Sequence, residues 1–232
     1  MTEEPARSEG REPPLEERLA AIRDRIETAA QAAGRSPAEI TTVVVTKFQP
    51  LGLVRELAAL GVRDFGENRH QEARDKAAAL PGLRWHFVGQ LQTKKARQVR
   101  SYAQVIHSVD REQLVDALAA PGVPVEVFLQ VNLTDDPTRG GAAPADASRL
   151  AERILAAEGL RLLGIMAVAP LEEEPRSAFA RLRKLAEAVR SVVPSATAIS
   201  AGMSGDFEAA IAEGATHLRI GTAITGSRPP RA

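Results

Sequence analysis

One lysine of this sequence stands where an apolar strand ends. The chain contains five lysines among its 30 basic residues, and Lys47 alone directly follows a β-branched run, TTVVVT at residues 41–46. A lysine at the mouth of an apolar barrel is partly desolvated, which favours the neutral amine that forms a Schiff base with a carbonyl compound. Lys47 is therefore a candidate for imine chemistry, although a solvated lysine at a strand end has the same sequence signature.

Two glycine-containing segments near the C-terminus have the composition of anion-binding turns. Residues 200–206, SAGMSGD, precede a helical segment, and residues 219–222, RIGT, follow the last apolar run. The first segment allows a tight turn whose N–H groups converge, and Gly221 lets the backbone of Thr222 approach a ligand closely. Each segment alone could be a helix cap or a strand end. Together they predict a phosphate site, because the loops after strands seven and eight are the recurrent phosphate site of α/β barrels.

These two features describe one ligand, with an aldehyde at one end and a phosphate at the other. Pyridoxal 5'-phosphate (PLP) fits this description. A barrel resembling a class I aldolase, which holds a sugar phosphate through the same lysine, is an alternative that explains the same residues. That alternative predicts no visible chromophore.

Short apolar runs alternate with helical segments along most of the chain. The candidate strands are residues 41–46, 62–65, 85–88, 105–107, 125–131, 162–166, 196–199 and 217–220. The segments between them suit crossover helices, and a further helix begins at Leu15. This alternation predicts one α/β domain, a single (β/α)8 TIM barrel. An open doubly wound sheet is the weaker alternative, because no glycine-rich dinucleotide motif follows strand one. Residues 134–143 are predicted to be a solvated connection rather than a cover.

Composition narrows the domain organisation and the class of function. Residues 1–14 hold almost nothing apolar and are predicted to be a disordered tail, which leaves residues 15–232 as the barrel. The 30 basic and 30 acidic groups give a formal charge of zero, which argues against a nucleic-acid partner. The absence of cysteine and the spacing of the four histidines argue against a metal site. The acidic N-terminus and the short apolar runs predict a cytoplasmic protein without a membrane partner.

Several motifs, taken together, resemble a known family. They are VVVTK ending at Lys47, DFGEN at residues 64–68, WHFVGQLQ at 85–92, GIMAV at 164–168, SAGMSGDFEAAI at 200–211 and LRIGTAITG at 218–226. This set resembles the pyridoxal phosphate homeostasis proteins, also called the YggS or PROSC family, and the last two motifs are the most specific. The resemblance implies a fold-type III PLP-binding barrel like the N-terminal domain of alanine racemase, without the second β domain of that enzyme.

The resemblance also implies a role for individual residues. Lys47 would hold PLP as a reversible aldimine, and Arg219 would face the pyridine nitrogen, where a cation disfavours protonation and weakens the ring as an electron sink. The residues implied around the phosphate are Ser204, Gly221 and Thr222, with Ser200 and Met203 beside them. Asn68 ends the second strand and is predicted to reach the ring. His86 is predicted to be packed or hydrogen-bonded locally instead.

The same resemblance bears on activity. Alanine racemase needs an acid/base group on each face of the cofactor, and a tyrosine of its second domain supplies one. The only tyrosine here, Tyr102, is predicted at the end of the third crossover helix, remote from the mouth. The leading hypothesis is a monomeric PLP carrier without robust catalytic activity, which serves vitamin B6 homeostasis and delivers PLP to apo-enzymes. The alternative is a fold-type III enzyme with weak amino-acid racemase or lyase activity, using Lys47 as its single base.

Overall fold

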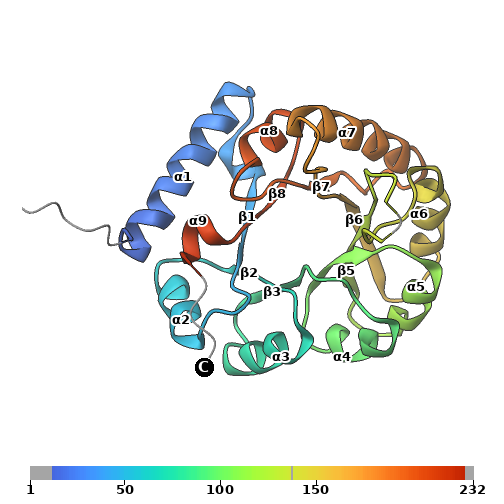
Figure 1. Ribbon diagram of the computed structural model, residues 1–232. Helices are drawn as coiled ribbons and strands as arrows, with labels where there is room; N and C mark the ends of the chain where they lie inside the picture. Colours follow the sequence, from blue (N-terminus) through green and yellow to red (C-terminus); the bar gives the residue numbers. More distant parts are fainter. Residues whose placement is uncertain (1–11, 137, 228–232) are drawn as a thin grey trace, which may run out of the picture.

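Short β-branched and aliphatic runs form the strands of the computed structural model, which describes residues 12–136 and 138–227. The strands are β1 (Thr41–Val45), β2 (Asp64–Glu67), β3 (Arg84–Phe87), β4 (Val105–Val109), β5 (Val125–Gln130), β6 (Leu160–Met166), β7 (Ala198–Ser200) and β8 (His217–Ile220). They are parallel and paired in chain order, and β8 pairs with β1, so that the described part of the chain forms a closed eight-stranded barrel (Figure 1). The predicted TIM barrel is confirmed.

Helices surround the barrel on its outer face (Figure 1). They are α1 (Leu15–Ala32), α2 (Leu51–Ala59), α3 (His70–Ala79), α4 (Ala96–Arg100), α5 (Glu112–Leu118), α6 (Ala147–Leu155), α7 (Pro175–Val192), α8 (Phe207–Ala212) and α9 (Thr222–Thr225). Short 3-10 helices cover Pro37–Glu39, Thr93–Lys95 and Pro144–Asp146. Most of the tail predicted at residues 1–14, residues 1–11, lies outside the described residues.

The first helix, α1, packs across the place where the barrel closes. Its apolar side chains recur every three or four residues and are buried, as in Leu19, Ile22 and Ile26. The helix contacts α8 and α9, and Arg18 Nε donates a hydrogen bond to the carbonyl of Ile224, 2.8 Å away. This helix therefore fixes the last two helices, which follow β7 and β8.

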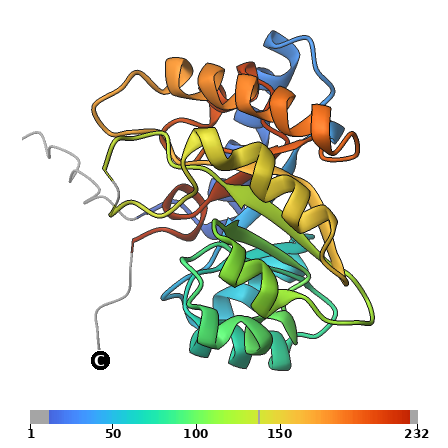
Figure 2. The ribbon, with the colours of Figure 1, turned by 90° about the vertical axis from the view of Figure 1, so that its right-hand side faces the viewer.

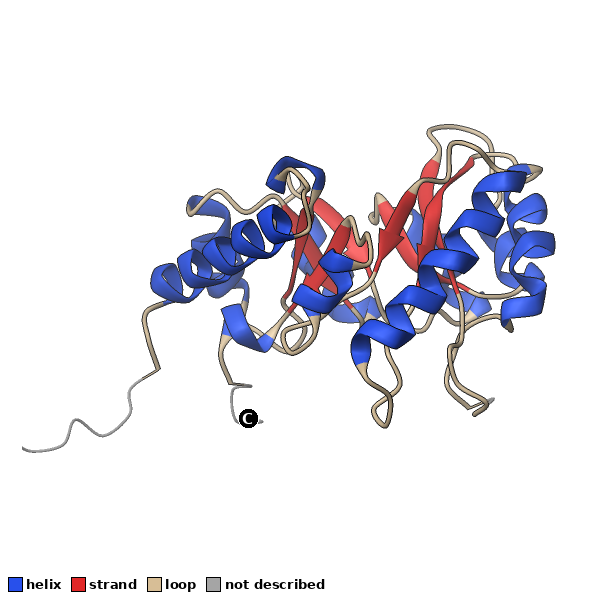
Figure 3. Cartoon of the chain, turned by 90° about the horizontal axis from the view of Figure 1, so that it is seen from above, coloured by secondary structure: helices blue, strands red, loops and turns tan. Residues whose placement is uncertain are grey.

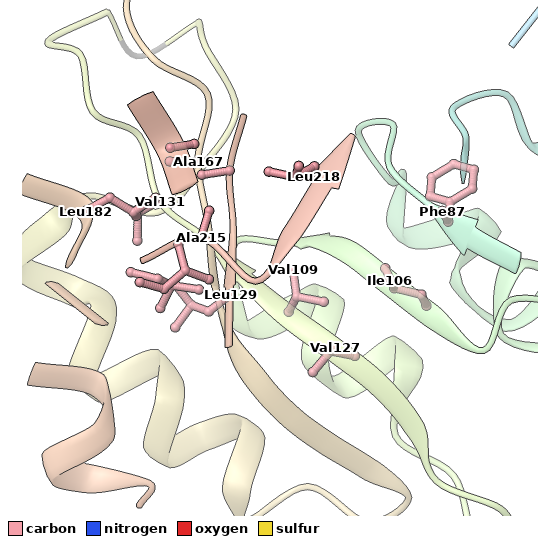
Figure 4. Packing of buried hydrophobic residues seen from close by; sticks show 14 of the residues in the cluster. Phe87, Ile106, Val109, Val127, Leu129, Val131, Ala167, Leu182, Ala215 and Leu218 are labelled. Atoms are coloured by element: carbon pink, nitrogen blue, oxygen red, sulfur yellow. The ribbon is translucent and has the colours of Figure 1, made fainter. Parts of the chain in front are cut away.

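The main hydrophobic core lies between the outer face of the sheet and the helices. Successive strand residues point to opposite faces, so that one half of each strand packs outwards. Figure 4 shows part of this layer, with Ile106 on β4 and Val127 and Leu129 on β5, all of them fully buried. The other half of each strand faces the barrel interior.

The barrel interior is unusually polar. In most TIM barrels, layers of branched apolar side chains fill this space. Here a small apolar cluster of Val105, Phe128 and Met166 lies beside His107, whose ring stacks on Phe128 at a centroid distance of 4.6 Å. His86 is also buried. The interior therefore holds titratable groups that the surrounding sheet shields from water.

The long loops of the protein gather at one end of the barrel. Figure 2 shows the barrel from the side, with the extended connections after β5 and β6 at the end where the strands finish. Figure 3, turned about the other axis, shows the strands inside the ring of helices. Side chains at strand ends and in these loops are therefore brought to a common mouth. Among the described residues, no helix combines the length and apolar character needed to cross a membrane.

Candidate cofactor site at the barrel mouth

A cavity of about 420 Å³ opens at the C-terminal ends of the strands. Its lining includes Lys47, Asn68, Met203, Ser204, Gly205, Arg219, Gly221 and Thr222, together with Val45, Val88, Gln90, Gln130, Gly140, Met166 and Val168. Seven of the residues predicted from the sequence thus meet in one place. A cavity of about 590 Å³ lies at the opposite end of the barrel, where arginines of β3 and β6 pair with Glu126. The mouth is where TIM barrels carry their active sites.

Lys47 projects into this mouth from the end of β1. Its side chain is exposed, and its amine makes no hydrogen bond or ion pair within residues 12–136 and 138–227. The partial burial expected from the sequence is therefore not provided by the protein, because Lys47 stands just beyond the last buried strand residues. The amine is accessible to a carbonyl compound entering the cavity.

A buried ionic cluster holds the backbone on both sides of Lys47. Lys76 Nζ donates to the carbonyl of Thr46 at 2.8 Å and to Glu67 Oε1 and Glu72 Oε1, both at 2.7 Å. Thr46 Oγ1 also donates to Glu67 Oε1, and the N–H of Phe48 donates to Glu72 Oε1, each at 2.7 Å. Burial raises the pKa of Glu67, against the opposing effect of Lys76. The cluster fixes where the Lys47 side chain leaves the backbone.

The segment after β7 forms a tight turn with unpaired N–H groups. Gly202 has a φ of 90°, and a Cβ there would approach Phe207 Cα to 2.9 Å, so glycine is required for the turn to pack on α8. Ser204 does not cap α8, whose N-cap residue is Asp206. The Asp206 carboxylate accepts from the N–H of Met203 at 2.6 Å. Ser204 Oγ instead accepts from the N–H of Ala223 at 3.3 Å, which joins this turn to α9.

Several backbone N–H groups in the two glycine segments have no acceptor among the described residues. They include those of Ser204, Gly205, Gly221 and Thr222. The last two precede or begin α9, where the N–H groups of Ile224 and Thr225 both donate to the carbonyl of Gly221. Unpaired N–H groups that converge in turns and at helix starts are the usual donors to a bound anion. The two segments predicted to bind a phosphate are thus adjacent and carry free donors.

Arg219 lies deeper in the cavity and is buried. Its NH1 donates to Ser200 Oγ at 2.7 Å, and its NH2 donates to the carbonyl of Ala167 at 3.0 Å. Burial lowers the pKa of Arg219 to about 10, which leaves the guanidinium charged at neutral pH. Ser200 is itself fully buried behind Arg219 and does not line the cavity, in contrast to the other predicted residues.

Asn68, His86 and Tyr102 occupy different positions. Asn68 lines the cavity, and its buried Oδ1 has no hydrogen-bond donor in the described structure. His86 does not line the cavity, because its ring is turned to Asp64 and His107, each 2.9 Å away. Tyr102 lies near α3, with its hydroxyl 3.3 Å from His70 Nδ1, and is absent from the lining. Only Asn68 of the three is available to a ligand.

The loop after β5 forms part of the cavity wall. Gln130 Nε2 donates to the carbonyl of Gly140 at 2.9 Å, and Asn132 Nδ2 donates to the carbonyl of Arg139 at the same distance. These side chains fold the loop back onto β5, and Gly140 lines the cavity. The prediction of a solvated connection holds for the exposed residues 135, 136 and 138, but the contacts of the loop with Gln130 and Asn132, which place Gly140 in the lining, are not evident from composition.

Comparison with known proteins identifies the family. Residues 18–229 match the family model for the N-terminal domain of alanine racemase. The chain is 44% identical over 223 residues to the pyridoxal phosphate homeostasis protein of Pseudomonas aeruginosa, covering 92% of this chain and 96% of that protein. It is 39% identical over 222 residues to the protein of the same name from Escherichia coli, covering 90% and 95% of the two chains.

Solved structures show the same relationship. PipY of Synechococcus elongatus without PLP superposes with a TM-score of 0.81 at 35% identity, covering 92% of this chain and all of that one. The structure of PipY with PLP bound gives 0.78 at 34% identity over the same shares. Alanine racemase of Corynebacterium glutamicum, at 15% identity and a TM-score of 0.72, shares the fold over 63% of its length. This chain therefore belongs to the family of pyridoxal phosphate homeostasis proteins, whose barrel is that of the alanine racemase N-terminal domain.

Proposed function

We propose that this protein binds PLP reversibly at the barrel mouth, through Lys47, and serves PLP homeostasis. The observation that carries the proposal is the accessible Lys47 amine in the same cavity as the unpaired N–H groups of Ser204, Gly205, Gly221 and Thr222. PLP, when bound, supplies an aldehyde that condenses with a lysine amine and a phosphate that accepts hydrogen bonds. The names of the relatives and the PLP-bound structure of PipY support the same ligand.

The remaining residues of the lining suit the rest of this cofactor. The phosphate would accept from the N–H groups of the turns at Ser204 and at Gly221–Thr222, beside Met203. Ser200 would act only through its hydrogen bond with Arg219. Asn68 also lines the cavity, where its side-chain amide would lie beside the cofactor ring. Arg219 would lie towards the pyridine nitrogen, where its fixed positive charge disfavours protonation of that nitrogen. Such an environment weakens carbanion chemistry.

Holding and releasing the cofactor requires an open site rather than a sealed one. Lys47 is exposed and Met203 is 39% exposed, so that water or a second amine can reach the linkage. The racemase type of chemistry needs a second acid/base group, and Tyr102 is not in the lining. We propose a carrier that works as a monomer through the barrel of residues 15–232 and delivers PLP to apo-enzymes.

Visible absorption of the purified protein tests the binding proposal. With added PLP, the wild type is expected to gain a yellow band that borohydride converts to a stable adduct on Lys47, located by peptide mass spectrometry. Lys47→Ala is expected to lose the band and the adduct. Lys184→Ala, which removes an exposed lysine of α7, is the matched control and keeps both. A wild-type protein that gains no band contradicts the proposal and favours a sugar-phosphate site.

Proton exchange separates a carrier from an enzyme. The loaded protein is incubated in D2O with a panel of small amino acids, and deuterium at Cα is followed by NMR. Less than one exchange per protein molecule is expected of a carrier. Exchange over many turnovers that Lys47→Ala abolishes would replace the carrier with a fold-type III enzyme. Sedimentation of the same sample tests the monomer, and reactivation of an apo-enzyme by the loaded protein tests delivery.

A further inference from the structure

A continuous chain of hydrogen bonds crosses the barrel interior and ends at Arg219. Asp64 Oδ1 lies 2.9 Å from His86 Nε2, His86 Nδ1 lies 2.9 Å from His107 Nε2, and His107 Nδ1 lies 2.9 Å from Ser200 Oγ. Ser200 Oγ accepts from Arg219 NH1 at 2.7 Å. The two histidines, Ser200 and Arg219 are all buried. We infer that His86 and His107 are positioning residues that fix Arg219 in the cofactor cavity by orienting the hydroxyl of Ser200.

The two ends of this chain determine the direction of every hydrogen bond in it. The Asp64 carboxylate only accepts, so His86 carries its proton on Nε2 and leaves Nδ1 as an acceptor. His107 therefore donates from Nε2 and accepts at Nδ1, where the hydroxyl of Ser200 donates. The oxygen of Ser200 is then free to accept from Arg219, which can only donate. One arrangement, with both histidines neutral, satisfies every member.

The electrostatics of the chain agree with this arrangement. Burial lowers the pKa of His86, and it lowers the pKa of His107 well below its usual value. Although partial burial raises it, the hydrogen bond from His86 leaves the pKa of Asp64 below its usual value. Both imidazoles are therefore neutral and the carboxylate is ionised at pH 7. The two buried histidines are therefore paired, neutral members of a hydrogen-bonded network that joins the Asp64 carboxylate to the Arg219 guanidinium.

The hydrogen-bond chain affects the cavity from a distance because few hydrogen bonds hold the Arg219 side chain in place. Within the described part of the chain, its guanidinium donates hydrogen bonds to Ser200 and to the carbonyl of Ala167. Without His107, the Ser200 hydroxyl would lose the acceptor that fixes its rotation. The hydroxyl would then rotate freely, and its oxygen lone pairs would no longer be held towards Arg219 NH1. The Arg219 guanidinium would then lose one of the two oriented hydrogen-bond acceptors that hold it. The effect on PLP rests on the function proposed above, whereas the orientation of the chain does not.

The first experiment measures the direction of the hydrogen bonds in the ligand-free protein. Long-range 1H–15N NMR of the uniformly labelled, ligand-free protein distinguishes the two neutral tautomers of each histidine. Both His86 and His107 are expected as the Nε2–H tautomer, and Ser200→Ala is expected to change the Nδ1 shift of His107. A charged His107, or a His107 protonated at Nδ1, would overturn the inference whether or not the protein binds PLP.

The second experiment is a double-mutant cycle on PLP affinity. His107→Phe is expected to weaken binding by about tenfold or more, the usual effect of losing a hydrogen bond that supports a charged group, and to shift the absorption band. In a Ser200→Ala background, the same substitution should change affinity by less than about twofold, because the two residues act in series. His217→Phe is the matched control, since His217 packs on Phe128 in the same interior outside the chain. It should leave affinity unchanged.

The cycle separates a positioning role from general damage. Losses in the two single variants that add up in the double variant would show that His107 acts independently of Ser200 and would contradict the inference. An equal loss in His217→Phe would do the same, because it would trace the effect to the packing of the interior. If the wild type binds no PLP, the proposed function fails, but the histidine tautomers still test whether the hydrogen-bond chain has the inferred orientation.

Discussion

Lys47 is positioned by its neighbours in the chain rather than by contacts of its own amine. The carbonyl of Thr46 and the N–H of Phe48 both bind the Lys76–Glu67–Glu72 cluster, so that this free side chain starts from a fixed backbone. A reactive amine needs this combination of a defined origin and an unpaired head group. The ionic cluster fixes the backbone from which the Lys47 side chain starts and leaves the Lys47 amine unpaired.

Removal of the Lys76 amine should destabilise the protein strongly. Lys76→Met leaves Glu67, which is 1% exposed, without its counter-charge, and the unfolding free energy should fall by about 3 kcal/mol or more. Urea denaturation measures this, with Lys184→Met on the exposed face of α7 as the control expected within about 0.5 kcal/mol of the wild type. The triple variant Lys76→Met, Glu67→Gln, Glu72→Gln should recover part of the loss. An unchanged midpoint for Lys76→Met would show that the cluster contributes nothing to stability.

The residues with recognisable chemistry can be predicted from the sequence, and the residues that support them cannot. Lys47, Arg219 and the two glycine turns stand at strand ends, where barrel topology brings them together whatever the details of packing. Lys76 reads as one more helical lysine, and its i, i+4 spacing from Glu72 is typical of a solvated pair. The histidine chain depends on contacts between strands far apart in sequence. Its one signal is the presence of polar side chains at alternate positions of otherwise apolar strands.

At the level of elements, the sequence predicts the strands and crossover helices but not all of their boundaries. The apolar pattern places the second strand at residues 62–65, whereas β2 is Asp64–Glu67. Val62 is buried, but its N–H donates to the carbonyl of Leu57 and so closes the end of α2 after Gly61, whose φ is 89°. A buried apolar residue in a helix cap has the same sequence signature as the first residue of a strand. The short helix α9 is not evident from the sequence because TAIT has a β-branched composition.

One glycine is required for two strands to pair. Gly164 lies in β6 opposite Ala198, and a Cβ at this position would come within 1.7 Å of the Ala198 carbonyl oxygen. Gly164→Ala should therefore separate β6 from β7 and lower the unfolding free energy by about 3 kcal/mol or more. Gly52→Ala in α2, where a Cβ meets nothing within 4 Å, should instead stabilise by about 0.5 kcal/mol. Thermal melts of the two variants compare these effects, and equal shifts in Tm would contradict the packing argument.

At the scale of the whole molecule, the closed barrel makes its interior a separate environment. The outer face of the sheet packs with apolar side chains under the helices, while three of the four histidines of the chain lie within the interior or at its edge. Because these rings are shielded from water and lie close to one another, protonating any of them in the folded state is unfavourable. The same arrangement that orients Arg219 therefore ties the stability of the fold to pH.

Stability should fall as the pH is lowered from 7 to 5. Burial lowers the pKa of His86, His107 and His217, the last to about 4, whereas histidines of the unfolded chain titrate near 6.5. Below that pH the unfolded state binds protons that the folded state does not, so the stabilisation present above pH 6.5 is lost as the pH falls. Each histidine contributes up to about 1.4 kcal/mol per pH unit in this window.

Urea denaturation at intervals between pH 7.5 and 5 measures that slope. Three protons taken up by the interior histidines on unfolding would lower the free energy of unfolding by about 4–6 kcal/mol between pH 7 and 5. His70, whose pKa burial also lowers, adds to this fall, whereas Glu67, whose pKa is raised, acts in the opposite direction. His217→Phe should reduce the steepest slope by about one proton, because a phenyl ring at this position cannot titrate in either state. Asp64, whose pKa is lowered, contributes its loss only below this range, near and under pH 4. A stability that stays constant from pH 7 to 5 would mean that the interior histidines accept protons in the folded state, and the neutral hydrogen-bond chain leading to Arg219 would then be lost below about pH 6.5.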